Sequence, residues 1–205
     1  MTSIREIDRQ VRRLTGEDAT CRPFMCDGSP IGCEVVQAGI NPGTLTPFWP
    51  YWDAKKLGCD KVGWLAEHRR LNKGKRTPTR NRIEELCELL QPLRCMEMNM
   101  SHHYSKDQRD LTPSQRADTV VFDYLLNAIR PKVLIVHGNL PIRHLERILK
   151  VCIKKDEFVS HKLNDFTLDI IAAKVHFSRV SREYLRDFGT RVKNHVGASA
   201  IAHRI

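Results

Sequence analysis

Four polar side chains stand just after short apolar runs of the sequence, and together they could bind a neutral polar ring. Asn41 lies in the turn Gly-Ile-Asn-Pro-Gly at residues 39–43, and Asn99, His137 and His176 each follow another apolar run. Amides and imidazoles donate and accept hydrogen bonds without needing a fixed charge. The set therefore suits recognition of a neutral heterocycle.

Each of these residues also has a purely structural explanation. Asn99 could cap a turn, His137 could bond to a backbone carbonyl, and His176 could be a well-bonded core histidine. Their shared position after predicted strands favours the functional interpretation. The carboxyl ends of parallel strands meet at one edge of a sheet, and α/β proteins bind their ligands there.

The apolar periodicity alternates between strand-like and helix-like segments, which is typical of an α/β fold. Strands are predicted at residues 33–38, 94–98, 132–136 and 169–175. Helices are predicted at residues 4–14, 61–71, 79–90, 114–129, 141–149 and 182–192. We expect a single domain over residues 1–205, with residues 196–205 as a loose tail or a partner contact. We expect it to be a three-layer sandwich whose mainly parallel central sheet is flanked by helices.

The chain carries 34 Lys and Arg against 24 Asp and Glu residues, a formal net charge of +10, which favours an anionic partner. The cations gather at residues 69–82 and 179–193. They could simply solvate surface helices, but the excess also flanks the candidate loops. We therefore expect DNA as the partner, with Lys73, Lys75 and Arg76 near its phosphates. No basic amphipathic helix with an aromatic face points to a membrane surface.

Seven cysteines are scattered along the sequence without a close CxxC pair. Cys21, Cys26 and Cys33 match neither a zinc ribbon nor a ferredoxin spacing, so we expect buried thiols and no metal or other cofactor. The polar start is unlike a secretory signal, and no stretch is apolar enough to span a membrane. We expect a monomer with reduced thiols in the cytoplasm, associated with the nucleoid in a bacterium or nuclear in a eukaryote.

Three of the four polar segments resemble motifs of the uracil-DNA glycosylase superfamily. The turn at residues 39–43 is similar to the first motif of the mismatch-specific uracil- and thymine-DNA glycosylase branch. Glu97-Met98-Asn99 resembles the strand-end asparagine motif of other branches. Residues 175–180 resemble a histidine-proline-serine motif, with Phe177 in place of the proline. The aspartate and tyrosine that follow the first glycine in the most active branch are missing here.

This resemblance implies a monofunctional DNA glycosylase that flips uracil or a related damaged base out of DNA and hydrolyses its N-glycosidic bond. Asn41 would position the attacking water, and His176 would donate a hydrogen bond to the departing base. The base-contacting residues would be Gly39, Ile40 and Asn99, and the DNA-contacting residues would be Ser178, Arg179 and Val180. The last two would fill the gap that the flipped base leaves.

An aromatic run at residues 47–52 supplies the ring that we expect to stack on the base, and we assign this role to Phe48. Two other functions fit the same residues. One is a non-catalytic module that binds flipped bases or nucleic-acid ends. The other is an enzyme acting on free nucleotides or nucleosides, for which DNA binding would be weak and insensitive to salt.

Overall fold

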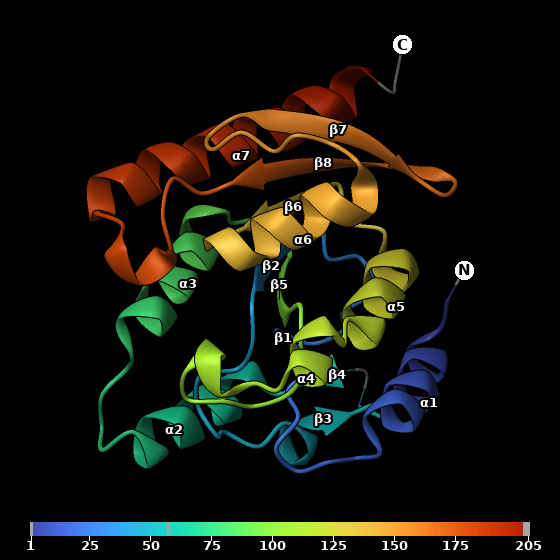
Figure 1. Cartoon of the computed structure of the whole chain (residues 1–205), viewed down its shortest axis with the longest axis vertical. Helices are drawn as coiled ribbons and strands as arrows, with labels where there is room; N and C mark the ends of the chain where they lie inside the picture. The colour runs from blue at the N-terminus through green and yellow to red at the C-terminus, as the bar shows by residue number, and fades with distance from the viewer. Residues whose placement is uncertain (1, 57, 203–205) are drawn as a thin grey trace.

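A mixed six-stranded sheet with the order β1-β5-β2-β6-β8-β7 forms the centre of the computed structural model, which describes residues 2–56 and 58–202 (Figure 1). Its strands are β1 (Phe24–Cys26), β2 (Val35–Gly39), β5 (Cys95–Asn99), β6 (Val133–Val136), β7 (Phe158–Leu163) and β8 (Phe166–Ala172). Strands β5, β2, β6 and β8 run parallel, whereas β1 and β7 pair antiparallel at the two edges. The predicted α/β class is confirmed, and the two edge strands make the sheet mixed.

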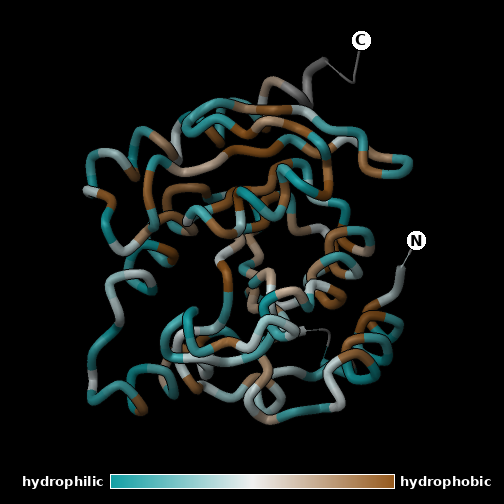
Figure 2. The backbone as a smooth tube through the Cα atoms, viewed as in Figure 1, coloured by the Kyte–Doolittle hydropathy of each residue, from teal (hydrophilic) through white to brown (hydrophobic). Residues whose placement is uncertain are grey.

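Helices lie on both faces of the sheet, because alternate residues of a strand point to opposite sides. The helices are α1 (Ile4–Thr15), α2 (Lys61–Leu71), α3 (Pro78–Leu89), α4 (Pro113–Ala117), α5 (Val120–Ile129), α6 (Asn139–Leu149) and α7 (Arg182–Ala202). Val36 and Leu134 pack with α1, α5 and α6, whereas Val35 and Val133 pack with α3 and α7. Every residue of β2 and β6 is buried, as expected for strands covered on both faces, and Figure 2 shows brown stretches beside paler ones in the middle of the fold.

The remaining elements are short. They are the 3₁₀ turns η1 (Trp49–Tyr51), η2 (Gln108–Asp110) and η3 (Phe177–Arg179), and the two-stranded sheet of β3 (Trp52–Asp53) and β4 (Gly58–Cys59). Within the described ranges, no helix combines the length and the apolar character needed to cross a membrane.

Capping residues begin the two helices that flank the cavity described below. Asp60 accepts a hydrogen bond from a backbone N–H in the first turn of α2. Thr77 does the same for α3, where Pro78 occupies the first helical position. The prediction of a helix at residues 61–71 is confirmed, and α3 lies within one residue of the predicted range 79–90.

Two predicted segments, a helix and a tail, differ in part from the structure. The predicted helix 114–129 is divided into α4 and α5, because Asp118 takes an extended conformation (φ −78°, ψ 94°) between them. The predicted loose tail is wrong for residues 196–202, since α7 continues to Ala202 and the side chain of Val196 is 2% exposed in the core. Residues 203–205 lie outside the described residues.

The edge strands were missed because their sequence signals are weak. β1 has only three residues, and β7 alternates half-buried and exposed side chains without a strong apolar pattern. β7 and β8 form a hairpin whose turn contains Asn164 in the left-handed region (φ 54°). β8 therefore begins three residues before the predicted strand 169–175 and ends at Ala172.

A buried cluster of charges joins α2, α3 and β5. Arg80 Nη1 lies 2.6 Å from Glu97 Oε1 and 3.0 Å from Glu84 Oε1, and Lys61 Nζ lies 3.0 Å from Glu84 Oε2. The side chains of Arg80 and Glu97 are 4% and 7% exposed. The Arg80 guanidinium also stacks 4.8 Å from the Trp64 ring centre. Because so little water reaches these charges, each depends on its partners for stability.

We expect Glu97→Ala to destabilise the protein by about 3 kcal/mol, since it leaves the buried Arg80 guanidinium with Glu84 as its remaining carboxylate. Glu157→Ala is the control, because Glu157 pairs with Lys154 and is 64% exposed. Its effect should stay below about 1 kcal/mol. Urea unfolding measures the loss in the free energy of unfolding for both variants. Equal effects of the two substitutions would show that the cluster is unimportant for stability.

Candidate functional site

A cavity of about 640 Å³ opens at the carboxyl ends of the parallel strands. Asn41, Asn99, His137 and His176 all line it. Asn99 ends β5, and the other three follow β2, β6 and β8, so the sheet topology brings together residues far apart in the sequence. The predicted convergence of the four polar segments is therefore present in the structure.

Gly39 allows the asparagine and histidine side chains to lie close to one another. A Cβ atom on Gly39 would lie 3.1 Å from His137 Cε1 and 3.5 Å from Asn99 Oδ1. The first distance is shorter than an ordinary van der Waals contact, so a larger residue would push His137 aside. Gly39 and its neighbour Ile40 both line the cavity, and their contact with a base stays a prediction.

The amide of Asn41 is held in one orientation. Its Nδ2 donates to the carbonyl oxygens of Ser105 (2.8 Å) and Pro42 (3.0 Å). Both amide protons are used in this way, which leaves Oδ1 as an acceptor. Asn41 can therefore hold a water molecule or a substrate donor, but it cannot remove a proton as a carboxylate would.

Asn99 ends β5 opposite Gly39 in the β2–β5 register, and its side chain is 8% exposed. Among the described residues, its amide has no hydrogen-bond partner. Neither polar atom of this amide is among the fully buried unpartnered atoms, so both stay open to the cavity, and a ligand with both a donor and an acceptor could pair with them. Asn99 thus presents both kinds of group to the cavity.

His176 is held as a neutral hydrogen-bond donor. Its Nδ1 accepts from the backbone N–H of Ser178 at 3.3 Å, so the proton of the neutral ring lies on Nε2. Burial, together with the charge of Arg179, lowers the pKa of His176. At neutral pH the ring therefore offers an Nε2–H group and no positive charge.

His137 is more deeply buried, with 4% of its surface exposed. Burial and the neighbouring His176 lower the pKa of His137 to about 3. Its ring stacks on Phe177 at 4.3 Å and meets His176 edge-on at 4.7 Å. Phe177, which replaces the proline of the resembling motif, is fully buried and supports the His137 ring.

Two predicted contacts were wrong. Phe48 is fully buried between Phe24 and Trp52, in the core on the α1 and α5 side of the sheet, so it is unable to stack on a ligand in the cavity. Val180 is 6% exposed and packs in the apolar cluster of α3 and α7. It therefore cannot fill a gap in DNA without leaving that core.

The other predicted DNA contacts lie at or near the cavity mouth. Ser178 and Arg179 line the cavity. Lys73, Lys75 and Arg76 do not line it, but they belong to the loop between α2 and α3, which continues into the lining residue Thr77. Lys73 and Lys75 are exposed, and Arg76 is half-buried.

The floor of the cavity contains polar residues that sequence analysis missed. They are Arg22, Gln37, His68, Arg80 and Glu97. Arg22 Nη1, Gln37 Oε1 and His68 Nε2 are buried and have no hydrogen-bond partner among the described residues. Gln37 and Glu97 interrupt otherwise apolar strands, and a polar residue inside a fully buried strand was the signal that could have found them.

Among the residues that the structure describes, two carboxylates line the cavity, and both are engaged. Burial disfavours the charge of Glu97, but the Arg80 guanidinium outweighs it and holds the pKa of Glu97 at about 2. At the rim, hydrogen bonds from Arg109 lower the pKa of Asp107 to about 2. Neither group is a ready proton acceptor at neutral pH, because so strongly acidic a carboxyl is a weak base.

No protein-family model and no curated protein sequence matches this chain. Conclusions about its chemistry therefore depend on the geometry of the cavity and on the resemblance of its motifs.

We expect the neutral His137 to make folding stability depend on pH. The folded-state pKa of about 3 lies below the unfolded value of about 6.5, so the unfolded chain binds a proton first as the pH falls. Protonation of this histidine in the unfolded chain should therefore lower the free energy of unfolding by about 2 kcal/mol as the pH falls from about 7.5 to about 5. Urea unfolding of wild type and His137→Asn at both pH values measures it. A pH dependence of the same size in the variant would show that His137 is not responsible.

Proposed function

We propose that the protein is a DNA glycosylase that hydrolyses the N-glycosidic bond of uracil, or of a related base, after the base is flipped into the cavity. The observation that carries the proposal is the meeting of Asn41, Asn99 and His176 in one cavity, two of them with fixed hydrogen-bonding orientation. The α/β fold with helices on both faces of the sheet is also compatible with the three-layer sandwich of the uracil-DNA glycosylase superfamily.

Base recognition is assigned to Asn99. Its amide oxygen can accept from the N3–H group of uracil while its nitrogen donates to O4. Cytosine presents the opposite pattern on the same edge, so it would leave both groups unpaired. A site of this kind rejects a mismatched ligand strongly because its buried polar groups lose their partners.

Bond cleavage is assigned to His176 and Asn41. As the bond between the sugar C1′ and the base N1 breaks, its electron pair moves to the base and negative charge grows on O2. The Nε2–H group of His176 stabilises this charge by donating a hydrogen bond to O2. Because Nδ1 is held by the backbone N–H of Ser178, the donor is oriented before the reaction begins. A water held by Asn41 Oδ1 adds its oxygen to C1′ and releases its proton to solvent.

DNA binding is assigned to the cations at the cavity mouth. Lys106, Lys155 and Arg179 line the cavity itself, and Lys73 and Lys75 are exposed in the adjacent loop. Phosphate contacts of this kind hold the duplex in register and carry no sequence information. They also supply binding energy that offsets the few kcal/mol needed to extrude a base.

One observation also fits a second function, a module that binds a flipped base without cleaving it. Glu97 and Asp107, the carboxylates that line the cavity, are both engaged by arginines. Neither carboxylate is then free to activate water, so the proposed mechanism relies on Asn41 to position it. A slow enzyme and a pure binding module share this feature, so activity has to be measured.

The deciding experiment is a single-turnover assay on labelled duplex DNA with one uracil. After incubation with excess protein, alkali should cleave the strand at the uracil, and free uracil should be released. DNA with cytosine at the same position is the control and should stay intact. Binding of uracil-containing DNA without any strand cleavage would support the binding module instead.

We expect Asn41→Ala to slow base release by about 100- to 1000-fold while DNA affinity stays constant, since one positioning group for the water is lost. Asn194→Ala is the matched control, because Asn194 is exposed on α7. Single-turnover rates decide the outcome. An unchanged rate in Asn41→Ala would remove this residue from the mechanism.

We expect Asn99→Asp to shift selectivity from uracil toward cytosine, at lower total activity. An ionised carboxylate in place of the amide repels O4 of uracil and accepts from the exocyclic amine of cytosine. Parallel assays on the two DNAs give the ratio of rates. If both rates remain at wild-type levels, Asn99 is not the residue that reads the base.

We expect DNA affinity to fall steeply with salt, and the triple substitution of Lys73, Lys75 and Arg76 by Ala to reduce the log–log slope by at most about 3. The control replaces Arg5, Arg9 and Arg13, which are exposed on α1 and do not line the cavity. Fluorescence anisotropy over a salt series measures both slopes. Equal slopes in the two triple variants would show that the loop cations do not contact DNA.

A further inference from the structure

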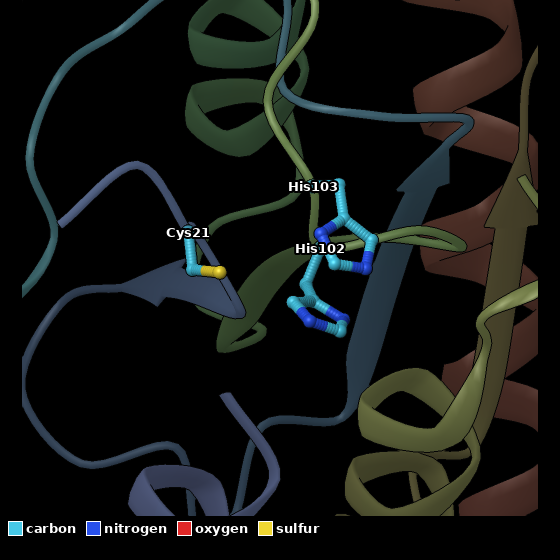
Figure 3. A group of neighbouring side chains, drawn as sticks. All are labelled: Cys21, His102 and His103. Carbon is cyan, nitrogen blue, oxygen red and sulfur yellow. The ribbon is translucent and has the colours of Figure 1, made fainter. Parts of the chain in front are cut away.

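Cys21, His102 and His103 form a cluster of potential metal ligands outside the cavity. One ligand atom from each residue lies within 4.8 Å of those of the other two. Cys21 precedes β1, whereas the histidines follow β5, and β1 pairs with β5 in the sheet. Figure 3 shows the sulfur of Cys21 directed toward the two imidazole rings.

His103 is oriented as metal-ligating histidines commonly are. His103 Nε2 lies 2.9 Å from Asp118 Oδ2, a hydrogen bond that leaves Nδ1 with the lone pair. A carboxylate bonded to the outer nitrogen of a ligating histidine is a recurrent feature of zinc sites. His102 Nε2 lies 3.9 Å from the same Asp118 oxygen, and the rings are 4.1 Å apart.

The surroundings of His102 indicate a ligand independently of the spacing of the cluster. Its side chain is 4% exposed, and its Nδ1 is buried without a hydrogen-bond partner among the described residues. A buried nitrogen in this state costs free energy that a coordination bond would recover. Cys21, at 2% exposure, is too enclosed to act as a nucleophile on an external substrate.

We propose that Cys21, His102 and His103 bind a Zn²⁺ ion, with Asp118 orienting His103 and a water molecule as the fourth ligand. One thiolate and two imidazoles are the mixed sulfur and nitrogen set that zinc favours. Zinc bonds of about 2.0 to 2.3 Å place ligand atoms roughly 3.3 to 3.8 Å apart. The spacing of up to 4.8 Å therefore closes around the ion with side-chain shifts of about 1 Å or less.

The ion would join two segments that border the cavity. Arg22, whose side chain lines the cavity floor, directly follows Cys21, and its backbone N–H donates to His102 O at 3.3 Å. The segment with the two histidines continues to Ser105, whose carbonyl accepts from Asn41. Binding of zinc thus stabilises the folded arrangement of these segments and is independent of the reaction in the cavity.

Elemental analysis of the purified protein tests the proposal. We expect one zinc per chain in wild type, and at least a tenfold loss of bound zinc in Cys21→Ser and in His103→Ala. Cys59→Ser and His161→Ala are the controls, because both residues lie outside the cluster, and these variants should keep the metal. Zinc retained by Cys21→Ser at the wild-type level would overturn the proposal.

A second measurement covers the case in which the cluster variants do not fold. Wild-type protein stripped with a chelator is titrated with Co²⁺, and we expect a thiolate-to-cobalt charge-transfer band that Cys59→Ser retains. Zn²⁺ should also raise the melting temperature of the stripped protein. Absence of both the band and the stabilisation would show that the cluster holds no metal.

Discussion

The buried ion pair between Arg80 and Glu97 is the interaction on which the site depends. It connects the first turn of α3 to the strand that ends at Asn99, directly beneath the cavity. Burying two charges costs several kcal/mol for each unless partners compensate for the lost water. The added contacts to Glu84 and Trp64 provide that compensation. Helix and strand are thereby fixed in one relative position, and so is the polar floor.

The histidines that line the cavity after β6 and β8 are neutral, in contrast to the charged residues of its floor. His137 and His176 lie where burial disfavours positive charge, and both have lowered pKa values. The site therefore combines a floor that contains ion-paired charges with neutral hydrogen-bonding groups at the strand ends. Such a combination can bind a ligand that is neutral on entry and becomes negative during reaction, because the donors are already oriented.

Residues at the ends of the parallel strands could be predicted from the sequence, since parallel topology brings such residues to one edge regardless of side-chain packing. Asn41, Asn99, His137 and His176 were found in this way. The edge strands β1 and β7 were not, because short or half-exposed strands have little apolar periodicity.

Packing explains the other differences between prediction and structure. Phe48 and Val180 were assigned to ligand contacts from their sequence position, yet a large apolar side chain is stabilised by burial wherever the core offers space. Arg22 could not be predicted as a cavity residue, since nothing in a linear sequence indicates that this cation is buried. Its burial, like the meeting of Cys21 with His102, arises from the pairing of β1 with β5.

The most direct test of base binding in the cavity is a crystal structure of the protein with duplex DNA that contains a non-cleavable 2′-fluoro analogue of deoxyuridine. We expect the uracil ring to be extruded into the cavity, with its N3 and O4 edge against the amide of Asn99 and its O2 facing His176 Nε2. A uracil that stays stacked in the duplex, or DNA bound to a face away from the cavity, would contradict the proposed site.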